Sequence, residues 1–172
     1  MFLYNGRNKQ VKEAVSNANL LMQNHSNFIG RIGVGAGQEY TMTEVDPGDI
    51  ASFMKDRYMN SIQRVRCRYT WNPFSKALAW FKPSLPNTIT LHTRRLKRYK
   101  NKKQNIDSLT GSIMHEYVHL VDNFYKYARF GHGDNRSYKA FDEESEMWTQ
   151  KYYSAPYRIG GIAKEFCEKT IG

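Results

Sequence analysis

Residues 111–124, GSIMHEYVHLVDNF, place two histidines four positions apart and a glutamate directly after the first. Residues four apart project from the same side of a helix, so His115 and His119 would share one face with Glu116 beside them. The apolar positions that favour a helix here are Leu109, Ile113, Tyr117, Leu120 and Val121. The stretch therefore predicts an amphipathic helix with a cluster of reactive side chains on one face.

The spacing of these three residues is typical of a zinc site. Two imidazoles one helical turn apart can bind a single zinc ion, and Glu116 can then lie close to a metal-bound water. Zinc brings the pKa of such a water toward neutrality and polarises a carbonyl group. We therefore expect His115 and His119 to be zinc ligands and Glu116 to be the general base that takes the water's proton.

The chain before this stretch alternates between helical and extended patterns. Residues 9–23 have the spacing of an amphipathic helix, and Asp46 with Pro47 marks the start of a second helix that runs to about Met59. The glycine-rich residues 27–40 lack a nucleotide-binding fingerprint and predict a flexible turn. The histidine-bearing helix is expected to begin near residue 107, capped by Asp107 or Ser108.

A small sheet is predicted between these helices. In SIQRVRCRYTW, residues 61–71, strict alternation predicts a half-buried strand with arginines on one face. Two further strands are predicted in KALAWFK, residues 76–82, and NTITLHT, residues 87–93, which gives a sheet of three to five strands. The two faces of the first strand would carry Val65, Cys67, Tyr69 and Trp71 on one side and Arg64, Arg66 and Arg68 on the other.

The part that follows is expected to be helical, with helices in residues 137–153 and 159–170. Helices and strands in separate blocks predict an α+β fold, with a small twisted mixed sheet against the histidine-bearing helix and further helices. At 172 residues the chain is expected to form a single domain, 1–172. No membrane span and no signal peptide are evident, which predicts a cytoplasmic protein, and two distant cysteines cannot form a disulfide framework.

The formal net charge of +10 is large for this length, and seven basic residues fall within residues 94–103, RRLKRYKNKK. Such a run attracts polyanions at low salt, although a solvated loop that promotes solubility explains it equally well. Together with Arg64, Arg66 and Arg68, this segment predicts a possible contact with a polyanion.

Residues 87–160 resemble the HExxH zinc metallopeptidases, or zincins, in the HEYVH motif and in the strand NTITLHT that precedes it. In that family an edge strand of the sheet aligns an extended peptide substrate beside the metal. The resemblance implies a zincin-like fold, one zinc ion bound by His115 and His119, Glu116 as the general base, and a protein or peptide substrate.

A catalytic zinc needs a third protein ligand, and three residues compete for this role. His132 lies in GHGDN, where Gly131 and Gly133 permit a sharp reversal of the chain, and some zincins take a third histidine from such a turn. The spacing from His119 is longer than in the tightest family pattern, so the helix would have to end near residue 122 or the loop would have to be long.

The other two candidates are acidic. Glu144 could reach the metal from the following helix if the motif helix ran on to about residue 129, and Asp122 follows His119 by one turn, where an aspartate more often orients a histidine. We take His132 as the expected third ligand, with Glu144 and Asp122 as alternatives.

Further residues near the motif could contact the substrate. A tyrosine hydroxyl could steady the oxyanion formed during hydrolysis, although aromatic packing explains most of these side chains. The candidates are Tyr152, Tyr153 and Tyr157. His92, at the end of the presumed edge strand, is expected on the surface.

These observations favour zinc-dependent hydrolysis of a peptide bond as the function. The rival is a basic module that binds nucleic acid or another polyanion and in which the HExxH site is structural or inactive. Its support is the charge and the many tyrosines, but no helix-turn-helix or RNP sequence is present.

Overall fold

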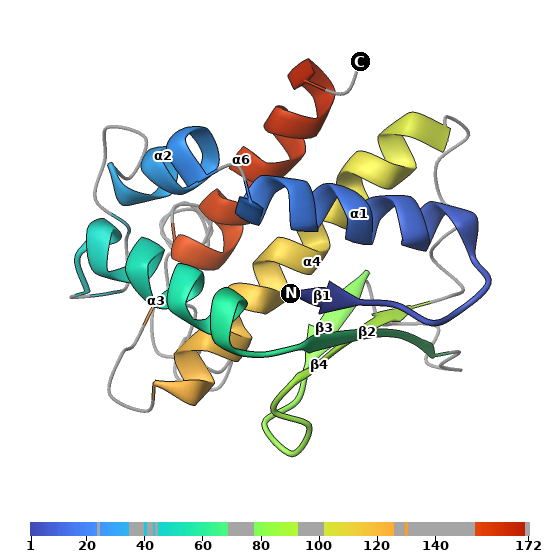
Figure 1. Ribbon diagram of the computed structural model, residues 1–172, viewed down its shortest axis with the longest axis horizontal. Helices are drawn as coiled ribbons and strands as arrows, with labels where there is room; N and C mark the ends of the chain where they lie inside the picture. The colour runs from blue at the N-terminus through green and yellow to red at the C-terminus, as the bar shows by residue number, and fades with distance from the viewer. Residues whose placement is uncertain are drawn as a thin grey trace, which may run out of the picture.

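The computed structural model describes residues 1–23, 25–34, 40, 43, 45–68, 78–92, 102–125, 130 and 154–170. Within them the fold is α+β, as expected, with five α-helices and a mixed four-stranded sheet. Figure 1 shows α4 running through the middle of the molecule, with the sheet below it and the other helices around it. The helices are α1 (Lys9–Gln23), α2 (Gly30–Gly33), α3 (Pro47–Asn60), α4 (Lys102–Phe124) and α6 (Ala155–Thr170), with a π-helical turn at His25–Ile29.

Two helices begin and end where the sequence predicts. The bounds of α1 agree with the predicted range 9–23, and Asn8 caps it by accepting a hydrogen bond from the Val11 N–H. Asp46 caps α3 through the Gly48 N–H at 2.7 Å, and Pro47 is the first helical residue. Pro and a capping carboxylate at these positions satisfy the free backbone groups at a helix start.

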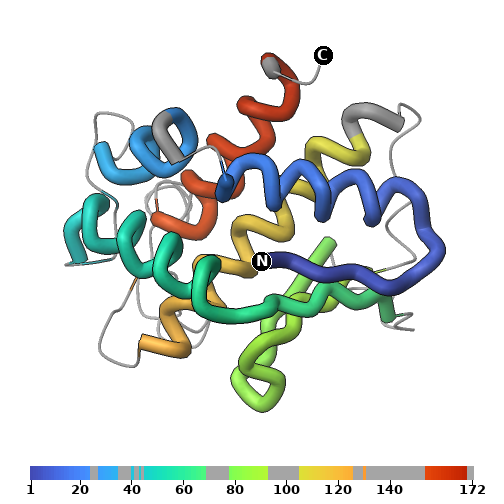
Figure 2. Tube along the Cα trace, in the orientation of Figure 1, coloured from blue at the N-terminus to red at the C-terminus, as the bar shows by residue number. Residues whose placement is uncertain are grey.

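The sheet has the order β1-β2-β4-β3, with β1 at Phe2–Leu3, β2 at Gln63–Arg68, β3 at Ala79–Phe81 and β4 at Thr88–His92. β2 runs parallel to β1 and β4, whereas β3 turns back antiparallel to β4. Figure 2 shows the N-terminal strand in the centre of the molecule, beside β2. The predicted strands are confirmed, but the expectation that residues 87–93 form the edge is wrong, because β3 covers that side of β4.

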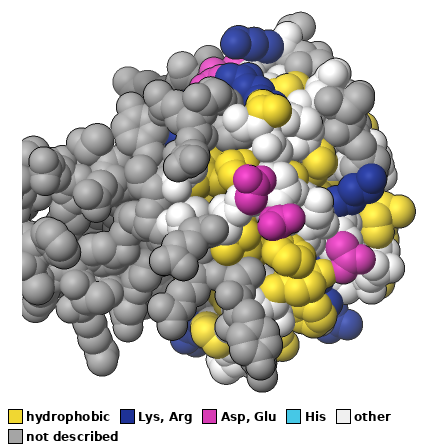
Figure 3. Space-filling model, turned by 90° about the vertical axis from the view of Figure 1, so that its left-hand side faces the viewer, with side chains coloured by type: hydrophobic (Ala, Val, Ile, Leu, Met, Phe, Trp, Pro, Cys, Tyr) yellow, Lys and Arg dark blue, Asp and Glu magenta, His cyan; other side chains and the backbone are white. Residues whose placement is uncertain are grey.

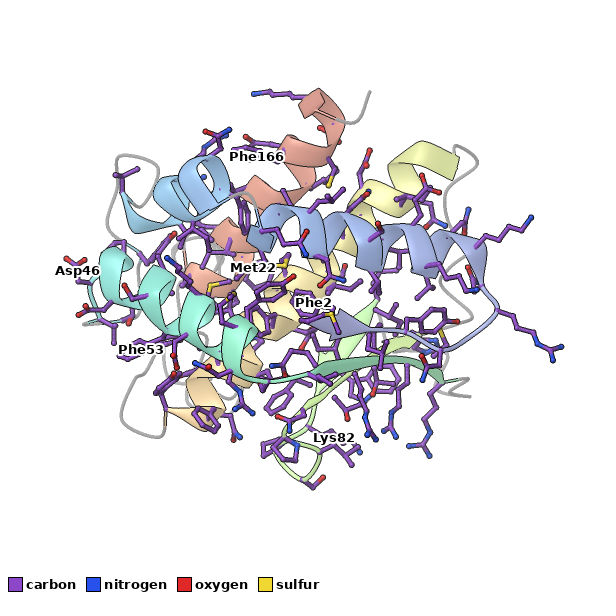
Figure 4. The ribbon with its side chains drawn as sticks, viewed as in Figure 1. Phe2, Met22, Asp46, Phe53, Lys82 and Phe166 are labelled. Carbon is purple, nitrogen blue, oxygen red and sulfur yellow. The ribbon has the colours of Figure 1, made fainter. Side chains whose placement is uncertain are left out.

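The core lies between the sheet and the helices. Phe2, on β1, contacts the ring of Tyr117, on α4, with the ring centroids 4.9 Å apart. In Figure 4 the labelled side chains of Phe2 and Met22 both point into this interior. The sheet contributes Val65, Ala79, Ile89 and Leu91 to the core, and α4 contributes Leu109, Ile113, Met114, Tyr117, Val118, Leu120 and Val121.

Two predictions about local structure are corrected. Within 27–40, described residues form the π-helical turn and α2 in place of a flexible turn, because Phe28 and Ile32, four apart, are both fully buried. The start of α4 lies at Lys102, so Asp107 is a buried residue within the helix and not its cap. The additional turn makes its own tertiary contact, since Asn105 Nδ2 donates to Gln10 Oε1 of α1 at 2.7 Å.

Two glycines allow α4 and α6 to touch backbone to backbone. A Cβ added to Gly160 would lie 2.9 Å from the carbonyl oxygen of Gly111, and one added to Gly111 would lie 2.7 Å from that of Gly160. Both distances are too short for any residue other than glycine, so the crossing requires glycine on both helices. The last predicted helix, 159–170, is confirmed but begins earlier, at Ala155.

This contact predicts opposite effects at two adjacent glycines. Gly160→Ala should lower the free energy of unfolding by about 1–3 kcal/mol, because the helices must move apart. Gly161→Ala is the matched control, since nothing lies within 4 Å of its added Cβ. It should raise stability by up to about 1 kcal/mol through helix propensity. Urea unfolding of both variants tests this, and equal effects of the two changes would contradict the close crossing.

Candidate metal centre

The two histidines of the motif lie on one face of α4 with their rings close together. The ring centroids of His115 and His119 are 5.0 Å apart, at an interplanar angle of 69°. Two imidazoles bound to one tetrahedral zinc, with nitrogen–metal distances of about 2.0–2.1 Å, also place their centroids about 5 Å apart. The pair therefore has the separation that a shared zinc ion requires.

These histidines belong to a polar stripe along an otherwise buried helix. From Ser108 to Asn123 every apolar residue of α4 is buried, and the partly exposed positions are all polar. We call this set the α4 stripe: Ser108, Ser112, His115, Glu116, His119, Asp122 and Asn123. Its members recur every three or four residues, so they follow one face of the helix that is neither sealed in the core nor fully exposed.

Glu116 turns from this stripe toward the sheet edge. Its Oε2 accepts a hydrogen bond from the backbone N–H of Phe81 on β3 at 2.8 Å. In an antiparallel pair, the backbone groups of alternate residues point toward the partner strand. The His92 N–H donates to the Leu78 carbonyl, so Leu78 and Trp80 face β4 and the N–H of Phe81 points away from it. Phe81 and Ala79 therefore present their backbone groups to the outer edge of β3, where Glu116 meets one of them.

Burial changes the acidity of Glu116. Desolvation raises its pKa from 4.5 to about 7, and the Phe81 N–H opposes part of this rise by stabilising the carboxylate. A carboxyl group with a pKa near neutrality can both accept and release a proton at physiological pH. Both protonation states of Glu116 are therefore populated near neutral pH.

Helix α6 covers the other side of His115. The Tyr157 ring lies edge-on to the His115 ring, with centroids 4.6 Å apart and planes at 83°. Gly160, one turn further along α6, leaves room for His115, because an added Cβ there would come within 3.2 Å of the His115 Cβ. Burial raises the pKa of Tyr157, and the negative charge of Glu116 raises it further, so its hydroxyl keeps its proton at neutral pH.

Two of the three candidates for a third metal ligand fall outside the described residues. His132 and Glu144 lie outside them, and Asp122 is a partly buried member of the α4 stripe. Helix α4 ends at Phe124, five residues after His119. This end satisfies the condition set for His132, a helix that stops near residue 122, and it is shorter than the helix to residue 129 on which the Glu144 alternative depends.

Among the described residues, no group of three His, Cys, Asp or Glu side chains is arranged to hold a metal ion. What these residues supply is a pair of imidazoles, the donor type that suits zinc, with a carboxylate beside it. The pair fits two of the three protein ligands of a catalytic site.

The structure also bears on the tyrosines and on His92, which the sequence placed near the motif. Tyr157 lies at the site, whereas Tyr152 and Tyr153 are outside the described residues. His92 is buried and only 1% exposed, so its predicted surface position is wrong. The ring of Trp80, on the neighbouring strand of the hairpin, packs against it with the centroids 5.9 Å apart.

Sequence reasoning missed two contributors to the site. The first is Phe81, which acts through its backbone and so leaves no signal in residue identity. The second is the pair Gly111 and Gly160, for which there was a signal: glycine inside a helix costs about 1 kcal/mol relative to alanine and often marks a close packing contact.

Comparison of the chain with protein-family models, with curated proteins and with solved structures finds no match.

The raised pKa of Glu116 predicts how the stability of the zinc-free protein depends on pH. Its folded pKa, about 7, lies above the usual 4.5, so folding favours the protonated form. The free energy of unfolding should fall by on the order of 2 kcal/mol as pH rises from 4.5 to 7, and Glu116→Gln should lack this component. Urea unfolding in EDTA at several pH values measures it, with Glu168→Gln as the control. Parallel curves for the wild type and Glu116→Gln would contradict the assignment.

The Phe81 hydrogen bond predicts a second pH effect. Phe81→Pro removes the N–H that stabilises the carboxylate, yet interrupts no bond to β4, because that N–H faces outward. The pKa of Glu116 should rise further, so the stability loss in EDTA should move to higher pH. Phe81→Leu keeps the N–H and should leave the midpoint unchanged. If both variants moved it equally, the side chain and not the hydrogen bond would be responsible.

Proposed function

We propose that the chain is a zinc-dependent peptidase of zincin type. His115 and His119 would hold one zinc ion, His132 is our choice for the third ligand, and Glu116 would act as the general base. The observation that supports this most directly is the hydrogen bond from the edge strand β3 to Glu116. This bond joins the proposed base to an edge strand where a substrate could bind, and the imidazole pair lies on the same helix as the base.

In this proposal the residues divide the work of hydrolysis. Bound zinc would supply an acidic water and polarise the scissile carbonyl. Glu116 is anchored through Oε2, so Oε1 is the atom that we assign to taking the water's proton and passing it to the leaving amine. Tyr157 would donate its hydroxyl hydrogen to the developing oxyanion, since its raised pKa keeps it protonated.

The substrate would bind along the outer edge of β3. The backbone groups of Ala79 point away from β4 and toward this edge, next to the Phe81 N–H that holds Glu116. An extended peptide can add to such an edge through main-chain hydrogen bonds, and its side chains then set specificity. In the zincins an edge strand has this role, and β3 takes it here in place of the predicted strand 87–93.

Metal content and a single carboxylate substitution test the proposal. Protein purified with zinc should contain about one zinc ion per chain by elemental mass spectrometry, and His119→Ala should lose it. Glu116→Gln should keep zinc but cleave a mixture of randomised fluorescence-quenched peptides about 10²–10⁴-fold more slowly. Glu168→Gln, the same change on the exposed face of α6, is the matched control and should cleave normally.

Two results would overturn the proposal. Absence of zinc after incubation at neutral pH would exclude the metal site, and undiminished cleavage by Glu116→Gln would exclude the assigned base. The same zinc measurement on His132→Ala, Glu144→Ala and Asp122→Ala identifies the third ligand, and we expect the largest loss of zinc with His132→Ala. Among the described residues no helix has the length and apolar character needed to cross a membrane.

A further inference from the structure

The sheet has a second face, directed away from α4, that carries the arginines of β2. Val65 on β2 is buried toward the core, and the alternate residues Arg64 and Arg68 are exposed. The register places Arg64 beside Thr88, Arg66 beside Thr90 and Arg68 beside His92. We call the outer face the set Arg64, Arg66, Arg68, Trp80, Thr88, Thr90 and His92, of which Thr90 and His92 are buried and the others are exposed or partly exposed.

The part of the chain that contains β2, β3 and β4 carries positive charges and no negative ones. From Arg57 to Ile106 the sequence has thirteen Lys and Arg residues and not one Asp or Glu. Among the described residues every Asp and Glu lies in a helix or caps one, and acidic side chains stand together at the α2 and α3 end of the molecule (Figure 3). The ion pairs there join Arg31 to Glu165 and Lys164 to Glu168, both distant from the outer face. The arginines of β2 thus carry charge that no described carboxylate neutralises.

The spacing of the three arginines on β2 suits a polymer with regularly spaced negative charges. Alternate residues of a strand lie about 7 Å apart, so the three guanidinium groups form a row along β2. Arg66 is held in place, since its Nε donates to Thr90 Oγ1 at 3.0 Å. Lys82 stands at the turn after β3, at the lower end of the sheet in Figure 4. Guanidinium groups bind phosphate through paired N–H donors, so such a row matches successive phosphates of one strand.

An aromatic ring lies on the same face of the sheet, across β4 from this row. The register pairs Trp80 with Thr90, and Thr90 with Arg66, so the indole stands across β4 from the central arginine. Trp80 is partly buried, and His92 supports it from the side. An indole face beside a phosphate-binding row can stack on an unpaired base, which double-stranded nucleic acid and non-aromatic polyanions do not offer.

We infer that the outer face binds single-stranded nucleic acid, with Arg64, Arg66 and Arg68 on the phosphates and Trp80 against a base. This surface lies on the opposite side of the sheet from the histidines of α4. Binding there therefore leaves the candidate metal centre accessible, and it requires no zinc and no peptidase activity.

The first test removes the two exposed arginines. Binding of a fluorescein-labelled single-stranded oligonucleotide is measured by anisotropy in EDTA, with Glu116→Gln as the parent protein, so the result is independent of hydrolysis. Arg64→Gln with Arg68→Gln should weaken binding at least about tenfold at low salt and reduce the slope of log K against log salt by about 1.4. The matched control, Lys9→Gln with Lys12→Gln on exposed positions of α1, makes the same charge change and should weaken binding less than about threefold.

The second test distinguishes nucleic acid from other polyanions. Trp80→Leu should weaken binding of the oligonucleotide about tenfold and leave binding of heparin, which has no bases, unchanged. Equal weakening in the arginine and lysine pairs would overturn the inference in favour of net charge alone. Equal effects of Trp80→Leu on both ligands would overturn it in favour of a general polyanion. Thermal unfolding checks that each variant is folded, and the arginine pair keeps the Arg66–Thr90 bond to protect the sheet.

Discussion

The close crossing of α4 and α6 at Gly111 and Gly160 fixes the geometry on which the candidate site depends. Because the two backbones touch, His115, one turn after Gly111 in α4, lies against Tyr157, one turn before Gly160 in α6. A larger residue at either glycine would separate the helices and open this contact. The arrangement uses two helix-weakening residues within well-packed helices, and their cost of about 1 kcal/mol each is offset by packing.

A second constraint acts between α4 and the sheet. Glu116 loses hydration against the sheet, which disfavours its charge, and it regains part of that loss from the Phe81 N–H. The two effects act in opposite directions on the pKa of the carboxyl group, since burial raises it and the N–H lowers it. The same N–H belongs to an edge strand, so the tuning of Glu116 is tied to the place where a peptide could bind.

The sequence predicted those parts of the fold that depend on local pattern. The bounds of α1, the cap at Asp46 and the alternation of β2 follow from periodicity and capping chemistry, and all three are confirmed. The order of the strands could not be predicted from the sequence, because a short hairpin can place either of its strands at the edge of a sheet. The early start of α4 was also missed, since it depends on the contact between Asn105 and Gln10, residues far apart in sequence.

In the candidate site, too, the features that depend on local spacing could be predicted from the sequence, and those that depend on distant contacts could not. The spacing of His115 and His119 predicted that they share a face of α4, and their ring centroids lie 5.0 Å apart there, whereas Glu116 beside them turns toward β3. The roles of Phe81 and Gly160 come from a backbone donor and from the absence of a side chain, neither of which residue chemistry reveals. The buried position of His92 likewise depends on its pairing across the hairpin with the strand that carries Trp80.

The α4 stripe gives a physical reason to read the histidines as functional and not as core residues. A histidine that serves only packing is expected among the buried positions of a helix. His115 and His119 instead occupy the partly exposed stripe, which concentrates the polar groups of this helix from Ser108 onward, while the buried positions around them are almost all apolar. Partial burial lowers the local dielectric and strengthens interactions with a cation, yet leaves a path for water and substrate. A site that binds a metal and a water needs both properties, and between Ser108 and Asn123 of α4 only this stripe combines them.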